Sequence, residues 1–158
     1  TGSDGSQIDE SGYGLSASTK FVFGGGADLR AMVTIGDGVG RYIGLGFVPD
    51  GYVDGNSIAT ADVMAAFVAL RVPFGNGWRS NIMYGTTDID YDNDLIATAL
   101  ELNDTGSSFH INVIKNVLPK LDVGAELMWG EREIMSTGVV GANSGDFTRV
   151  QFSAKYAF

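Results

Sequence analysis

The chain has 158 residues, with ten Lys and Arg against 19 Asp and Glu, a formal net charge of −9, 23 Gly and no Cys. The absence of cysteine excludes a disulfide scaffold and a thiolate metal site. No apolar run is long enough for a membrane-spanning helix, and the length suits a single domain.

Seven segments alternate apolar and polar residues with a period of two, which is typical of strands with one apolar and one polar face. In the first segment, Leu15 and Phe21 alternate with Ser16 and Lys20. The seven segments span residues 12–23, 28–36, 60–74, 78–86, 108–118, 121–133 and 147–158. The last segment is long enough to cross a bilayer as a tilted strand.

The connections between these segments fall into two classes. Short turns at 24–27, 73–77 and 119–120 alternate with long loops, rich in Gly and Asp, at about 37–59, 87–107 and 134–146. Outer-membrane barrels have short turns on the periplasmic side and long loops outside. The sequence therefore predicts an all-β fold, an antiparallel up-and-down transmembrane β-barrel in the outer membrane of a Gram-negative bacterium.

The number of strands points to a larger barrel. Single-chain bacterial barrels have an even number of strands, and an open sheet in lipid leaves backbone groups unsatisfied at several kcal/mol each. We therefore expect residues 1–158 to be the C-terminal segment of one barrel domain, with the remaining strands on a precursor segment or another chain.

The two signs of charge occupy different places. Seven of the ten basic residues fall on strand positions that face away from the apolar stripe, while most acids lie in the long loops. A charged residue on the lipid face near the midplane costs about 2–4 kcal/mol, so the polar face should line a lumen. The predicted pore-lining residues are Lys20, Arg30, Arg71, Arg79, Asn81, His110, Asn112, Glu126, Arg132, Arg149, Gln151 and Lys155.

The five arginines of this set suit small organic anions, because guanidinium groups bind carboxylates through forked hydrogen bonds. Arg41, after the glycines Gly36, Gly38 and Gly40, is a candidate for a loop that folds toward the pore. The alternative is that the arginines only pair with acids and stiffen the wall. A structural or adhesive barrel without a conducting pore is therefore a second hypothesis.

Aromatic residues near strand ends, on the apolar face, are typical of a membrane-interface girdle. The predicted girdle residues are Trp78, Tyr84, Trp129, Tyr156 and Phe158. The partners that follow are outer-membrane lipid and lipopolysaccharide, with no nucleic acid. A soluble β-sandwich would also alternate, but its turns would not separate into a short side and a long side.

An acidic run in the second long loop resembles the start of a calcium-binding loop. Its candidate ligands are Asp88, Asp90, Asp92 and Asp94. The run has Asn93 at the position of the central Gly and Ala99 at the position of the bidentate Glu. We expect a solvated acidic loop, no metal site and no cofactor.

A serine hydrolase is a further alternative. His110, the single histidine, shares a strand with Asn112 and lies near Ser107 and Ser108. A hydrolase needs a histidine that takes the serine proton and a third group that orients the ring. Spacing alone does not establish such a triad, and we predict no catalytic residue and no enzyme activity.

The order of several short motifs resembles the C-terminal part of DcaP-like porins. These motifs lie at 36–42, 78–85, 110–112, 121–133, 149–152 and 155–158. The resemblance implies a barrel of about 16 strands, in the size class that leaves an aqueous channel. It also implies a homotrimer that passes small organic acids such as dicarboxylates. The family's N-terminal periplasmic coiled coil and first strands have no counterpart in this sequence.

Overall fold

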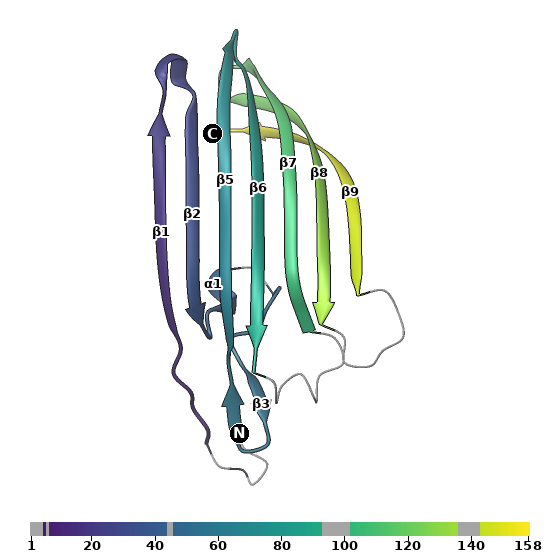
Figure 1. Cartoon of the computed structure of the whole chain (residues 1–158). Coiled ribbons are helices and arrows are strands. Elements are labelled where there is room, and N and C mark those ends of the chain that lie inside the picture. The colour runs from purple at the N-terminus through teal and green to yellow at the C-terminus, as the bar shows by residue number, and fades with distance from the viewer. Residues whose placement is uncertain (1–4, 6, 44–45, 93–101, 136–142) are drawn as a thin grey trace.

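A single antiparallel sheet of seven strands dominates the chain. The computed structural model describes residues 5, 7–43, 46–92, 102–135 and 143–158. The strands of the sheet, in spatial order, are β1 (Tyr13–Val22), β2 (Asp28–Asp37), β5 (Ala61–Gly75), β6 (Trp78–Tyr91), β7 (Leu102–Leu118), β8 (Leu121–Met135) and β9 (Ser144–Tyr156). Each strand pairs with the next of the seven along the chain, and the sheet curls into part of a cylinder (Figure 1). The predicted all-β, up-and-down fold is confirmed.

Three tight turns lie together at one end of the sheet (Figure 1). Between β5 and β6, Asn76 and Gly77 have φ values of 52° and 75°, the positive pair that a type I′ hairpin turn requires. Between β7 and β8, Lys120 has a φ of 73°. The Ala157 amide donates to the Lys120 carbonyl at 2.9 Å, so the last residues lie at this same end. The turn between β1 and β2 contains the 3-10 helix η1 (Gly24–Gly26).

The second long loop is shorter than predicted. β6 continues to Tyr91 and β7 begins at Leu102, so both strands extend into the predicted loop at 87–107. The reason is that Ile89 and Tyr91 are buried on one face of the sheet, which continues the alternation through the acidic run. The first long loop also holds an unpredicted hairpin of β3 (Tyr52–Asp54) and β4 (Ser57–Ala59).

The two faces of the sheet differ in chemistry and exposure. One face carries the apolar stripe predicted from the sequence. Its side chains are exposed to solvent, with Phe21 58% and Phe152 79% exposed. These residues are therefore not the interior of a globular domain. Among the described residues, no helix is long and apolar enough to cross a membrane.

The buried apolar residues lie on the opposite face, at the end with the long loops. Here the segment 38–50, which contains α1 (Gly40–Ile43), packs against the strands, and Val48 is 1% exposed. The cluster consists of Val39, Val48, Ala61, Val63, Ile89, Tyr91 and Leu102. The Asn103 side-chain amide donates to the Phe47 carbonyl and holds the segment against β7. We refer to residues 38–50 as the inner loop; residues 44 and 45 of it are outside the described set.

Gly40 lies where the two arms of the inner loop meet. A Cβ at this position would overlap the carbonyl oxygen of Val48 and lie 2.8 Å from that of Pro49. We predict that Gly40→Ala destabilises the folded protein by about 1–3 kcal/mol, as overpacking does in other closely packed sites. Urea unfolding in detergent micelles measures the change. Gly24→Ala is the matched control because a Cβ there meets nothing within 4 Å, and equal midpoints for the two variants would contradict the prediction.

Candidate functional site

The strand register brings the predicted pore-lining residues onto one face. Arg71 is opposite Asn81, Asn81 is opposite Asn112, and Asn112 is opposite Glu126, so these four share one row across β5 to β8. The same register places all twelve predicted residues on this face: Lys20, Arg30, Arg71, Arg79, Asn81, His110, Asn112, Glu126, Arg132, Arg149, Gln151 and Lys155. We call this set the polar wall.

The polar wall lies on the concave side of the sheet. A cavity of about 510 Å³ is lined by strand residues from β2 to β9 together with Tyr42, Ile43 and Phe47 of the inner loop. One cavity can touch so many strands only if the sheet curves around it. The inner loop therefore lies within the curve, near Ser108 and near Arg132 of the polar wall.

Arg41, the candidate pore-loop residue, lies in the inner loop, and its contacts are with Asp50. Its guanidinium forms an ion pair with Asp50, and its backbone amide donates to the same carboxylate at 2.8 Å. The hydrogen bond from the backbone amide, followed by that from the side chain, holds the pKa of Asp50 below its usual range. Among the described residues that line the cavity, Arg41 is absent.

A buried carboxylate that the sequence analysis missed organises two of the arginines. Asp28 is 3% exposed, and its Oδ1 accepts from Arg30 Nε at 2.7 Å. Its Oδ2 lies 3.6 Å from Arg71 Nη1. Arg71 Nε is buried and has no hydrogen-bond partner among the described residues. The signal in the sequence was the spacing, because an acid two residues before Arg30 in a strand must share its face.

A second ion pair lies nearer the tight turns. Arg79 Nη2 donates to Asp122 Oδ2 at 2.7 Å, and Asn116 Nδ2 donates to the other carboxylate oxygen at 2.9 Å. The alternative hypothesis, in which the arginines pair with acids and stiffen the wall, therefore applies to some of the basic residues. It does not apply to Lys20, Arg132, Arg149 and Lys155, which form no ion pair within the described part of the chain.

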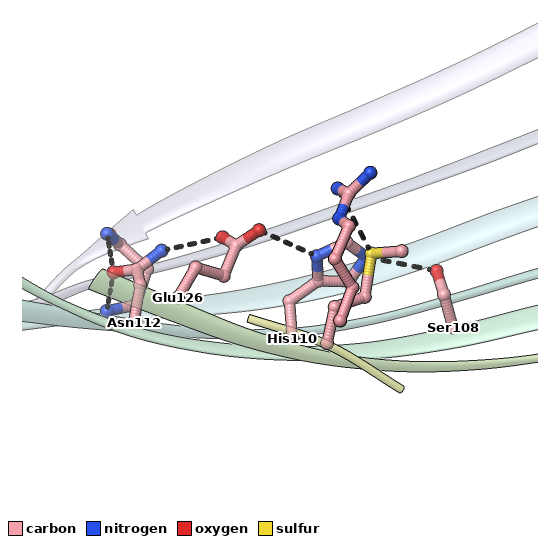
Figure 2. A network of polar contacts seen from close by, with 7 residues as sticks. Ser108, His110, Asn112 and Glu126 are labelled. Atoms are coloured by element: carbon pink, nitrogen blue, oxygen red, sulfur yellow. Dashed lines mark hydrogen bonds and ion pairs between the residues drawn. The ribbon is translucent and has the colours of Figure 1, made fainter. Parts of the chain in front are cut away.

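A polar network connects β6, β7 and β8 (Figure 2). His110 Nδ1 lies 3.3 Å from Glu126 Oε1, and His110 Nε2 lies 3.1 Å from Ser108 Oγ. Asn112 Nδ2 donates to Glu126 Oε2 at 3.2 Å, and Asn81 Nδ2 donates to Asn112 Oδ1 at 2.8 Å. The carboxylate of Glu126 is thus held by two uncharged side chains when the histidine is neutral.

The order Ser108, His110, Glu126 has the connectivity of a hydrolase triad, with the carboxylate in place of the predicted Asn112. A triad also needs preorganised donors for the oxyanion. Ser108 lies in the middle of β7, paired with Gly85 on one side and Gly130 on the other. The main-chain N–H groups at this position therefore take part in strand pairing. The network therefore lacks the backbone donors of an acyl-transfer site, and we interpret it as part of the wall.

Four of the predicted girdle residues lie on the apolar face, in two groups. Trp78 and Tyr156 lie at the end with the tight turns, and the ring centroid of Phe158, which follows β9, lies 5.4 Å from that of Tyr156. Tyr84 and Trp129 share a row through Phe109, and the rings of Phe109 and Trp129 are 5.8 Å apart. Six residues of β6 separate the two groups, which is about 20 Å along the strand.

The acidic run at 88–94 does not form a loop over its whole length. Asp88 and Asp90 belong to β6, Asp92 follows the strand, and Asp94 lies outside the described residues. Within the described ranges, no group of three or more His, Cys, Asp or Glu side chains could hold a metal ion.

No family model and no curated protein matches the chain. Among solved structures, the crystal structure of the outer membrane channel DcaP of Acinetobacter baumannii is similar, with a TM-score of 0.77 and 24% identical residues. The match covers 93% of this chain and 41% of that channel, so this chain spans less than half the length of DcaP. The resemblance expected from the sequence is confirmed at the level of the fold.

Because of its contact with Arg41, we predict that the Asp50 carboxyl titrates below about 3.9, the ordinary pKa of an aspartate. Because the pKa of Asp50 is lower in the folded than in the unfolded protein, the contact stabilises the inner loop above pH about 3.9. This stabilisation is lost as the pH falls through the folded-state pKa of Asp50. NMR of the Asp50 carboxyl carbon measures the midpoint. In Arg41→Ala the midpoint should rise but stay below the ordinary value, since the backbone amide of residue 41 remains. A midpoint that does not move would show that the guanidinium contributes nothing.

Proposed function

We propose that this chain forms part of an outer-membrane channel that passes small organic anions, dicarboxylates among them. The observation that carries the proposal is the separation of the two faces: the basic side chains gather on the concave face, and the other face is apolar and exposed. The fold shared with the DcaP channel supports it. In this proposal the polar wall lines a water-filled lumen, and the apolar face contacts outer-membrane lipid and lipopolysaccharide in a Gram-negative bacterium.

The proposed channel needs more strands than this sheet contains. Within the described residues, β1 and β9 each pair on one side only. A sheet edge in lipid leaves backbone groups unsatisfied at several kcal/mol each. We infer that strands from another segment of the same protein or from a second chain complete the barrel, with this chain as the C-terminal segment of one barrel domain, and that the barrel assembles as a trimer.

Adjacent residues of β9 test which face meets lipid. Val150 lies on the apolar face and Gln151 on the polar wall. Val150→Arg should reduce the stability of the protein in lipid vesicles by about 2–4 kcal/mol, the cost of a cation near the midplane, whereas Gln151→Arg should leave it nearly unchanged. The urea midpoint of the reconstituted full-length protein measures both. Equal losses in the two variants would remove the membrane assignment of this face.

Arg149 tests the anion preference, because it forms no ion pair in the described part of the chain. One unit charge at roughly 6 Å in water stabilises chloride and destabilises potassium by about 0.7 kcal/mol each, so Arg149→Ala should lower the chloride-to-potassium permeability ratio by up to about tenfold. The reversal potential in a KCl gradient across a planar bilayer measures this ratio. Lys115→Ala removes a cation from the opposite face and should leave the ratio unchanged.

Two outcomes of the same experiment would contradict the proposal. A wild-type protein that conducts with cation preference would remove the role given to the basic residues. A folded, reconstituted protein without conductance would favour the structural or adhesive barrel instead.

A further inference from the structure

One row of the concave face carries opposite charges on either side of a pair of amides. The row continues to Asp28 beyond Arg71 and to Gln151 beyond Glu126. Arg71, Asn81, Asn112 and Glu126 are direct cross-strand partners on four successive strands. The two asparagines between the charges are joined to each other and to Glu126 by hydrogen bonds. Across β5 to β8, the row therefore places two amide side chains between a cation and an anion.

The cation of this row is only partly neutralised. Asp28 supplies one negative charge for two guanidinium groups, and Arg30 takes the closer position, with its Nε 2.7 Å from the carboxylate. Arg71 lies 3.6 Å from the same carboxylate, beyond ordinary hydrogen-bond distance, and its buried Nε has no partner in the part of the chain that the structure describes. Arg71 therefore retains donors for a further acceptor, and a buried donor without a partner costs about 1–3 kcal/mol.

The anion of the row is not matched by a cation either. The Glu126 contacts in the described part of the chain come from Asn112 and His110, so no Lys or Arg pairs with it. Its side chain is 27% exposed, so it is accessible to a small solute.

Both charges line one cavity of about 260 Å³, together with Asp28, Arg30, Asn81, His110 and Asn112. Three strand spacings separate the Arg71 and Glu126 backbones by about 14 Å. Both side chains reach this cavity from the concave face of the sheet.

We propose that this cavity binds a small zwitterion, with the solute carboxylate at Arg71 and its ammonium group at Glu126. The inference rests on the proposed function, since it assigns a preferred solute class to the same pathway. A solute with a single carboxylate satisfies Arg71 and leaves Glu126 unmatched. A dicarboxylate long enough to span the cavity brings its second negative charge toward Glu126, where like charges repel. A zwitterion satisfies both Arg71 and Glu126.

Three solutes of equal chain length test the proposal on the unaltered full-length protein in planar bilayers. They are 4-aminobutanoate with both charges, butanoate with the anion alone, and butylammonium with the cation alone. The concentration dependence of single-channel current reduction gives the apparent Kd of each. 4-Aminobutanoate should bind about tenfold more tightly than butanoate, the effect of one additional charged hydrogen bond, and more tightly than butylammonium.

Two glutamine variants assign the preference to the row. Glu126→Gln should remove most of the tenfold advantage of 4-aminobutanoate and leave butanoate binding in place. Glu133→Gln removes a charge from the same strand on the opposite face, and it should keep the advantage. A heat-modifiable gel shift confirms that each variant is folded.

The outcomes separate the two proposals. An anion-preferring channel that binds 4-aminobutanoate and butanoate equally would overturn the zwitterion site and leave the proposed function standing. Retention of the full advantage in Glu126→Gln would also overturn it. A protein without conductance, or with cation preference, would instead overturn the proposed function.

Discussion

The structure depends on one constraint, the shared register of seven strands with a side-chain period of two. A slip of one residue between any two strands would turn a whole set of guanidinium groups from the concave face to the apolar one. The tight turns prevent such a slip, because a two-residue type I′ turn at Asn76 and Gly77 allows one pairing of β5 with β6. Local backbone geometry at one end of the sheet thus determines the chemistry of its two faces.

The net charge of the chain conceals this organisation. The formal charge is −9, yet the concave face carries seven basic residues of the polar wall. Two of the acids on this face are placed against particular cations, Asp28 against Arg30 and Asp122 against Arg79, whereas Glu126 pairs with no Lys or Arg among the described residues. What a solute meets is therefore set by the position of each charge in the register. The net charge of the whole sequence says little about the charges that a solute meets.

The sequence predicted the strands and the face of each wall residue because alternation is a local property. It did not predict the ends of β6 and β7, where the acidic composition obscured the inward positions of Ile89 and Tyr91. It also missed the pairing of Asp28 with Arg71, since a cross-strand partner depends on the turn and the register together. The packing of the inner loop depends on tertiary contacts, such as the Phe47 ring against Gly106, which no periodicity encodes.

The inner loop and the charged row lie at different depths of the sheet. Phe47 lies against Gly106, and Asn112 of the row is six residues further along β7, about 20 Å toward the tight turns. In the proposed channel, a molecule arriving from the long-loop side would pass the inner loop with Phe47 first and the charged row afterwards. Exclusion by size at the inner loop would then precede discrimination by charge at the row, so a large anion would be excluded before it reached Arg71.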